Sequence, residues 1–154
     1  MSPREFEELI ARLLVRDGHT QVRVVGGRGD LGADVIGVDP QGHRVVVQCK
    51  RYFGQPVSSG DVQRFLGTVW AEHRADLGVF VTTSRFTAAA LALGRRNGLH
   101  MLDRAALAAW MADGALPAPL AVARNTKVDP QGTLSDALAA DAIPPQMIER
   151  PPRP

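Results

Sequence analysis

The sequence predicts an α/β fold in which a mixed β-sheet is flanked by helices, in the order αβββαβαβα. Three observations support this class. Apolar residues recur at helical spacing near the N-terminus. Two strand-like runs joined by turn residues then predict an antiparallel hairpin. Finally, the apolar run 77–82 lies between two helical patterns, which is typical of parallel strands joined by helical crossovers.

The first helix has clear start and stop signals. Ser2, Pro3 and Glu5 form the pattern of an N-cap, a proline in the first turn and a capping-box acid. Gly18 provides the stop. The apolar residues that recur between these signals at spacings of three and four are Phe6, Leu9, Ile10, Leu13 and Leu14.

Three strands are expected next. The run 21–25 is strand-like, and the glycine-rich loop 26–32 separates it from a second run at 34–38. Residues 39–42 read Asp-Pro-Gln-Gly, which is typical of a turn. The third run, 43–50, is therefore expected to pair back on the second.

The rest of the folded region alternates helices and strands. Val62, Phe65 and Val69 recur at helical spacing, Gly98 is a helix stop, and Asp103 is a helix cap. The expected elements are a helix over 62–70, a buried strand over 77–82, a helix over 87–97, a short strand over 99–102 and a final helix ending near Met111.

Composition divides the chain into two regions. Its 154 residues suit one domain with a hydrophobic core. Residues 1–112 hold every aromatic side chain, with fourteen Arg or Lys against eleven Asp or Glu, a net charge of +3. Residues 113–154 hold eight of the eleven prolines and a net charge of −1. We expect a folded, mildly basic domain over 1–112, compatible with a nucleic-acid partner, and a flexible Ala/Pro-rich tail over 113–154.

The cellular compartment is suggested by the cysteine count and by the N-terminus. The chain has a single cysteine, Cys49, which excludes an internal disulfide and fits a reducing compartment. We expect Cys49 to be a small core residue. The N-terminus has no signal-peptide pattern, and no apolar run approaches the ~20 residues needed to span a bilayer. A cytoplasmic location without membrane association is expected.

Polar residues that can carry chemistry meet at the ends of two neighbouring strands. Gln48 and Lys50 are two residues apart and so share one face of their strand, while Asp34 begins the partner strand at the same end of the hairpin. A carboxylate, a carboxamide oxygen, a backbone carbonyl and waters suit Mg²⁺. The chain uses lysine only twice against sixteen arginines, so Lys50 suggests a site that needs a compact point charge.

Other acids near this site have to be considered. Glu7 lies on the flank of the apolar stripe of the first helix and can reach the edge of the sheet, whereas Glu8 faces away from the core. We therefore expect Glu7 to be the fourth residue of the site, with Asp34, Gln48 and Lys50, and Glu8 to be a solvated charge. Asp30 competes with Asp34 as a metal ligand, but Asp34 is preferred because it is nearer the strand and better fixed.

The loop 27–32 also fits the pattern G-x-G-x-x-G of dinucleotide-binding folds. That fold needs a helix after the loop and an acid about 20 residues further on. Here the strand-like run 35–38 follows instead, and position 50 is a lysine. We reject a nucleotide site. The loop is instead expected to let the backbone approach DNA, with Arg28 near a phosphate.

Together these motifs resemble the Mrr-like catalytic domain of the PD-(D/E)xK restriction-endonuclease-like superfamily. The resemblance covers roughly residues 2–111 and implies a restriction-endonuclease-like sheet. The segments that carry it are Phe6-Glu7, Gly26-Gly27 to Asp34, Gln48-Cys49-Lys50-Arg51-Tyr52, Gly78 through Ser84, and Phe86-Thr87.

The resemblance implies a metal-dependent endonuclease that hydrolyses phosphodiester bonds in DNA, as part of restriction or genome defence. Asp34 would be the metal-binding acid, Gln48 would replace the usual second acid as a metal ligand, and Lys50 would be the motif lysine. Glu7 would be the acid of the first helix and a further metal ligand. Mg²⁺ is the expected cofactor, with Mn²⁺ able to substitute.

Further residues near this site are weaker candidates for DNA contacts. Arg51 and Tyr52 follow Lys50 and either touch the substrate backbone or belong to ordinary surface. Gln63, on the next helix, is a candidate to orient Gln48 or a metal-bound water. Thr83 and Ser84, at a strand end, either contact phosphate or cap the following helix.

Two other functions remain open at this point. The first is a catalytically inactive DNA-binding or assembly module that keeps the nuclease fold, and the second is a DNA repair or junction-resolving nuclease. A homodimer is expected if both DNA strands are cut. Full Mrr-type enzymes carry a winged-helix recognition region, which this sequence does not show. We therefore expect either a separate target-recognition protein or little sequence preference.

Overall fold

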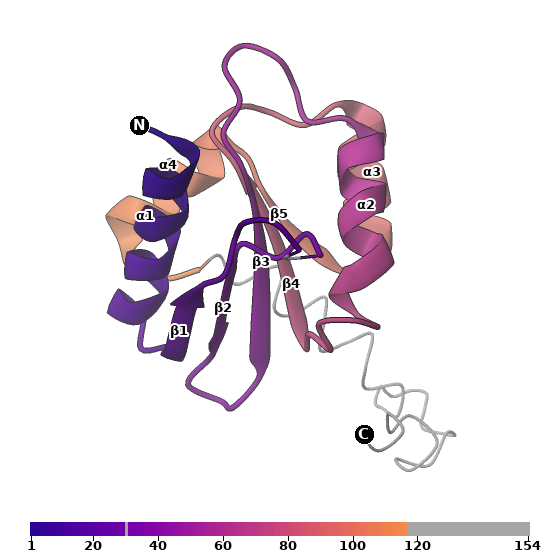
Figure 1. Ribbon diagram of the computed structural model, residues 1–154. Coiled ribbons are helices and arrows are strands. Elements are labelled where there is room, and N and C mark those ends of the chain that lie inside the picture. Colours follow the sequence, from indigo (N-terminus) through magenta and orange to yellow (C-terminus); the bar gives the residue numbers. More distant parts are fainter. Residues whose placement is uncertain (30, 117–154) are drawn as a thin grey trace, which may run out of the picture. The chain divides into compact units, whose positions relative to one another are not determined.

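A computed structural model describes residues 1–29 and 31–116 of the chain (Figure 1). Within these residues the elements follow the predicted order αβββαβαβα. The expected tail over 113–154 lies outside the described residues from 117 onward, as does Asp30. The elements are α1 (Pro3–Arg16), β1 (Thr20–Val24), β2 (Val35–Val38), β3 (Arg44–Lys50), α2 (Ser59–Val69), β4 (Leu77–Thr82), α3 (Ala88–Arg96), β5 (Leu99–Leu102) and α4 (Arg104–Asp113).

Side-chain caps fix where the first helices begin. Ser2 accepts a hydrogen bond from the Glu5 backbone and Glu5 accepts one from the Ser2 backbone, so the predicted capping box is present. A second capping box, between Ser58 and Asp61, starts α2 three residues before the expected range. Gly18, just after α1, has φ +90° and ends the helix as predicted.

The five strands form one mixed sheet in the order β1-β2-β3-β4-β5. Strand β2 pairs antiparallel with both β1 and β3, so the predicted hairpin is present. Strands β3, β4 and β5 are parallel, because α2 and α3 carry the chain back between them. The predicted α/β class is thereby confirmed.

Helices cover both faces of the sheet (Figure 1). Phe6 of α1 and Trp110 of α4 are buried against one face, in a cluster with Val47 and Cys49 of β3. Phe65 of α2 packs on the other face, in a cluster that includes Val46, Phe80 and Ala90. Among the described residues, no helix is both long and apolar enough to cross a bilayer.

The register of the hairpin determines which polar residues meet. Val35 of β2 pairs with Val47 of β3. The backbone N–H of Asp34 donates to the carbonyl of Val47 at 2.8 Å, so the ladder continues one residue beyond β2. Asp34 therefore lies beside Gln48, at the end of β3 from which the chain leaves for α2.

Candidate active site

Asp34 is held rigidly at the start of β2. Its side chain is buried, with a relative exposure of 7%. Its Oδ2 accepts hydrogen bonds from the Nε2 of Gln48, at 2.5 Å, and from the backbone N–H of Cys49, at 2.7 Å. Both donors belong to β3, so the hairpin itself fixes the carboxylate.

Glu7 comes to the same place from α1. A β-carbon added to Gly26 would lie 2.9 Å from Oδ1 of Asp34 and 2.8 Å from Oε2 of Glu7. The two carboxylates therefore face a common point beside the Gly26 backbone. Glu7 is 15% exposed and also lies 3.8 Å from the guanidinium of Arg4. Because residue 26 is a glycine without a side chain, the loop after β1 leaves room for the two acids to approach each other.

This pair of acids fits a divalent cation. Two carboxylates that face one another in a mostly buried place repel unless a cation lies near them. Within residues 1–29 and 31–116, no three His, Cys, Asp or Glu side chains form a metal-binding group. Mg²⁺ is compatible with such a sparse set, because it keeps several waters and needs only one or two carboxylates.

The carboxamide of Gln48 has partners on both sides. Its Nε2 donates to Asp34, and its Oε1 would lie 3.3 Å from a β-carbon added to Gly32. The hydroxyl of Thr68, on α2, would lie 3.4 Å from the same point and donates to the carbonyl of Leu31 at 2.6 Å. Gln48 therefore orients Asp34, and its oxygen lies beside Gly32, as does the Thr68 hydroxyl.

Thr68, a residue that the sequence did not indicate, is thus the α2 side chain beside Gln48. Gln63, the predicted α2 candidate, lies on the exposed side of the helix. The difference arises because the side of α2 that faces Gln48 depends on how the helix packs on the sheet, which the apolar stripe alone does not specify. The role expected of Gln63 stays a prediction.

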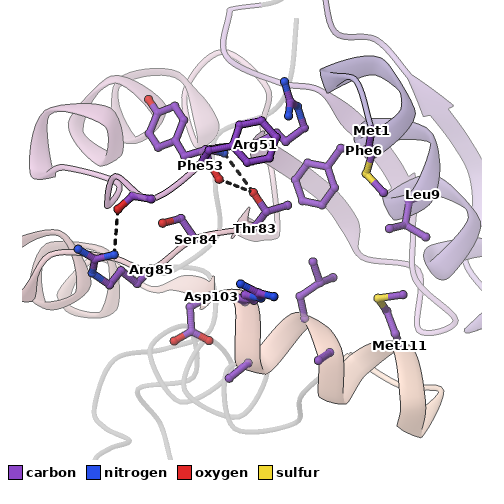
Figure 2. Close-up of a pocket in the computed structure, with 16 residues that line it drawn as sticks. Met1, Phe6, Leu9, Arg51, Phe53, Thr83, Ser84, Arg85, Asp103 and Met111 are labelled. Carbon is purple, nitrogen blue, oxygen red and sulfur yellow. Dashed lines mark hydrogen bonds between the residues drawn. The ribbon is translucent and has the colours of Figure 1, made fainter.

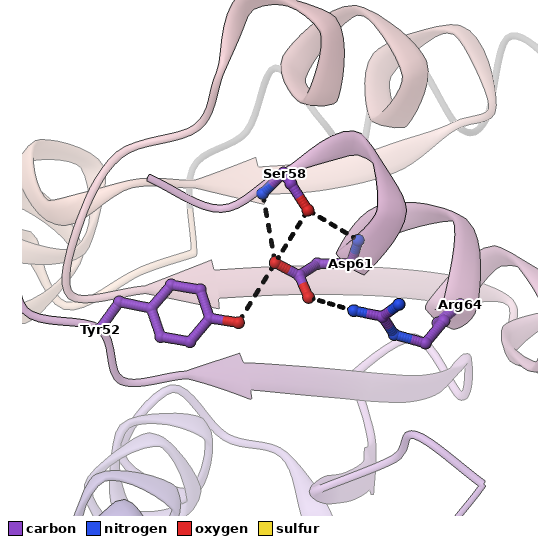
Figure 3. A network of polar contacts seen from close by, with 4 residues as sticks. All are labelled: Tyr52, Ser58, Asp61 and Arg64. Carbon is purple, nitrogen blue, oxygen red and sulfur yellow. Dashed lines mark hydrogen bonds and ion pairs between the residues drawn. The ribbon is translucent and has the colours of Figure 1, made fainter. Parts of the chain in front are cut away.

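Lys50 ends β3, and its charge acts on Asp61. Asp61 is the centre of a polar network with Tyr52, Ser58 and Arg64 (Figure 3). Asp61 accepts hydrogen bonds from the Tyr52 hydroxyl at 3.2 Å, from the Ser58 backbone at 3.2 Å and from Arg64 at 2.5 Å. Burial raises the pKa of Asp61. The hydrogen bonds from Ser58, Tyr52 and Arg64 and the charge of Lys50 outweigh that effect, so its pKa is lowered overall.

We expect Asp61→Asn to cost about 1–3 kcal/mol of unfolding free energy at pH 7, because it weakens a helix cap and charge-assisted hydrogen bonds. The pKa of Asp61 is lower in the folded chain than the usual 3.8. Its charge therefore stabilises the fold above that value and ceases to do so as the pH falls further. Urea unfolding at pH 7 and pH 3 measures the difference. The exposed Glu72 gives a matched control, Glu72→Gln, which should change little.

Cys49 lies on the face of β3 opposite Gln48 and is buried, as predicted. Burial raises the pKa of its thiol well above the usual value, and the negative charges of Asp34 and Glu7 raise it further. We therefore expect the native thiol to resist 5,5′-dithiobis(2-nitrobenzoic acid) for as long as the chain is folded, and one thiol per chain to react in guanidinium. Rapid labelling of the native protein at pH 8 would contradict this environment.

The remaining candidates for DNA contacts lie in different settings. Arg28 is exposed in the loop after β1. The hydroxyl of Thr83 donates to the carbonyl of Tyr52 at 3.0 Å, and the hydroxyl of Ser84 donates to the carbonyl of Gln55 at 2.6 Å. These two hydroxyls fasten the segment after β3 to the end of β4. Their proposed phosphate contacts stay predictions, as does that of Arg51.

A groove of about 950 Å³ lies next to these residues, between the N-terminal half of α1 and α4 (Figure 2). Arg51, Tyr52, Thr83 and Ser84 all line it. The sequence did not predict the groove, because its walls come from segments about one hundred residues apart.

One curated relative is similar to more than half of the chain. The type IV methyl-directed restriction enzyme EcoKMrr of Escherichia coli (strain K12) is 40% identical over 96 residues, which is 58% of this chain. The chain spans only 31% of the length of that relative.

Two solved structures share the fold at low identity. The DNA modification-dependent restriction endonuclease AspBHI gives a TM-score of 0.58 at 18% identity, over 81% of this chain and 36% of that one. The restriction endonuclease MspJI in complex with a 27-mer oligonucleotide gives 0.53 at 23% identity, over 94% and 35%. These likenesses confirm the predicted restriction-endonuclease-like fold.

The family itself is shown by a sequence comparison. The Mrr catalytic-domain family model, described as a restriction endonuclease, matches residues 1–111. That range agrees with the span of 2–111 over which the sequence motifs resemble this domain. Because the match takes in well over half of the chain, the protein belongs to the Mrr catalytic-domain family of restriction endonucleases.

Proposed function

We propose that this domain hydrolyses phosphodiester bonds in DNA as an endonuclease that depends on Mg²⁺, with Mn²⁺ able to substitute. The observation that carries the proposal is the convergence of Glu7 and Asp34 on one point beside Gly26. Family membership supports divalent-metal chemistry in general. The closeness of Glu7 and Asp34 at the end of the hairpin supports metal binding by these two residues in particular.

Each side chain has a distinct role in this proposal. Glu7 and Asp34 hold the cation, and a bound divalent cation supplies Lewis-acid polarisation of the phosphodiester. Gln48 keeps Oδ2 of Asp34 occupied by a hydrogen bond, so that Oδ1 is the oxygen turned toward Glu7. For Oε1 of Gln48 to become a further ligand, the amide has to rotate so that Oε1 and Nε2 exchange places. Lys50 supplies a point charge that stabilises negative charge developing on the phosphate or orients the attacking water.

The biological role we propose is restriction of foreign DNA. It rests on the 40% identity to a methyl-directed restriction enzyme. We propose that target choice either depends on a separate recognition protein or is weak. A homodimer in which each copy cuts one strand is part of the same proposal.

Supercoiled plasmid provides the first test. We expect nicked and linear products in Mg²⁺ and in Mn²⁺, and intact plasmid in EDTA. Comparing methylated with unmethylated plasmid tests the restriction role, and branched or mismatched duplexes test a repair role. Binding without cleavage in every metal would overturn the proposal and favour an inactive DNA-binding module.

A further inference from the structure

The groove between α1 and α4 is lined by residues that adjoin the acid site in the sequence. Phe6 lines the groove, and the next residue on α1 is Glu7. Arg51 also lines it and follows Lys50 directly along the chain. The groove and the acid site therefore use neighbouring residues of the same two segments, α1 and the end of β3.

The charge of the groove is complementary to a nucleic-acid backbone. Arg51, Arg85 and Arg104 line it, against a single acid, Asp103. That acid is already engaged, because its Oδ1 accepts a hydrogen bond from the backbone N–H of Ala106 and so caps α4. The surplus of positive charge favours phosphate oxygens at the arginine side chains.

The floor and mouth of the groove are apolar and aromatic. Phe6, Leu107 and Met111 are among its apolar lining residues, and Figure 2 labels Phe6 and Met111. At the mouth, the guanidinium of Arg51 lies 4.4 Å from the ring centroid of Phe53. Phe53 is 77% exposed, which is unusual for a phenylalanine. The exposed ring, with the guanidinium over it, offers an aromatic stacking surface.

An apolar groove with a stacking surface fits unpaired bases better than a duplex. In a duplex each base is covered by its neighbours, so only backbone and base edges are available for contact. An unpaired base exposes its face and can stack on an aromatic ring. The volume of about 950 Å³ is in the range of sites that enclose a small organic ligand.

We propose that this groove binds unpaired nucleotides of a DNA strand beside the phosphate to be cut. Phe53 and Arg51 stack on the bases, and Arg85 and Arg104 contact the phosphates. The proposal rests on the proposed nuclease function, and it narrows the substrate to DNA that is single-stranded or locally opened at the cleavage site.

Oligonucleotide binding tests this directly. Fluorescence anisotropy measures the affinity of the Asp34→Asn protein for a labelled single-stranded 15-mer and for the same sequence as a duplex, at fixed salt. Adding Phe53→Ala should weaken binding of the single strand about 5- to 100-fold, since one stacked base is lost, and binding of the duplex less than about twofold. Phe53→Trp should restore single-strand binding.

Matched control variants separate the effects of stacking and charge in the groove from effects that any surface substitution has on binding. Val15→Ala removes a side chain that is 58% exposed at the far end of α1, and should leave both affinities unchanged. Arg104→Ala should lower the salt dependence of single-strand binding by about 0.7 in its logarithmic slope. Arg96→Ala, on the exposed surface of α3, should not.

Two results would overturn the groove proposal. One is equal loss of single-strand and duplex affinity in Phe53→Ala, or no loss of either. The other is a Phe53-dependent dimer in sedimentation with unchanged oligonucleotide affinity, which would make the groove an interface between two copies. Plasmid cleavage by the parent protein is scored separately. If the parent protein cleaves plasmid while Phe53→Ala binds the single strand normally, only the groove proposal fails. If the parent protein does not cleave plasmid, the nuclease proposal fails, whatever the binding result.

Discussion

Asp34→Asn is expected to reduce plasmid cleavage in Mg²⁺ by about 10²–10³-fold, the loss typical of removing one electrostatic group from an active site. The substitution keeps the shape of the side chain but removes the charge that would hold the cation. An amide oxygen still accepts a hydrogen bond from the Cys49 backbone, as Oδ2 of Asp34 does at 2.7 Å. Thermal unfolding should therefore show a folded protein.

Two neighbouring glutamates provide a matched comparison for this effect. Glu7 faces Asp34 beside Gly26, whereas Glu8 follows it on the same helix, and we expect it outside the site. Glu7→Gln should lose cleavage to a degree similar to Asp34→Asn, and Glu8→Gln should cleave like the parent. Equal loss in both glutamate variants, or full activity of Asp34→Asn, would contradict the assignment of the acids.

Gly26→Ala is expected to lower cleavage about 10²-fold while leaving the fold intact. A β-carbon at this position would come within 2.8 Å of Glu7 and 2.9 Å of Asp34. Asp34 is held by two hydrogen bonds from β3, so Glu7, at the end of a longer side chain, is the acid that moves away. Displacing a catalytic group by about 1 Å costs activity on this scale.

The control for this variant is another glycine-to-alanine change in open space. A β-carbon at Gly67 of α2 would meet nothing within 4 Å, so Gly67→Ala should retain activity and stabilise the helix by about 0.5–1 kcal/mol. Initial cleavage rates and thermal melts of the two variants give the comparison. Parent-like cleavage by Gly26→Ala would mean that the two acids do not have to meet there.

Local sequence signals predicted the elements of the fold well. The cap at Ser2, the stop at Gly18 and the buried run 77–82 each depend on residues close together in the chain. The hairpin followed from one turn between two strand-like runs, and with it the placement of Asp34 beside Gln48. Helical spacing also put Glu7 on the side of α1 that reaches the sheet, where it meets Asp34 beside Gly26.

Features that need long-range packing were not predictable. The amide of Gln48 donates to Asp34, and no local pattern shows which of its two ends faces the acid. Thr68 comes beside Gln48 only because α2 packs on the sheet at a particular rotation. The groove needs α1 and α4 to lie side by side, although nearly ninety residues separate them.

A crystal structure of the protein soaked in Mn²⁺, with anomalous difference density measured near the manganese edge, tests the central claim most directly. We predict a peak next to the Gly26 backbone, coordinated by carboxylate oxygens of both Asp34 and Glu7, and absent in Asp34→Asn. An ion bound away from both carboxylates, or an unchanged peak in Asp34→Asn, would contradict the account.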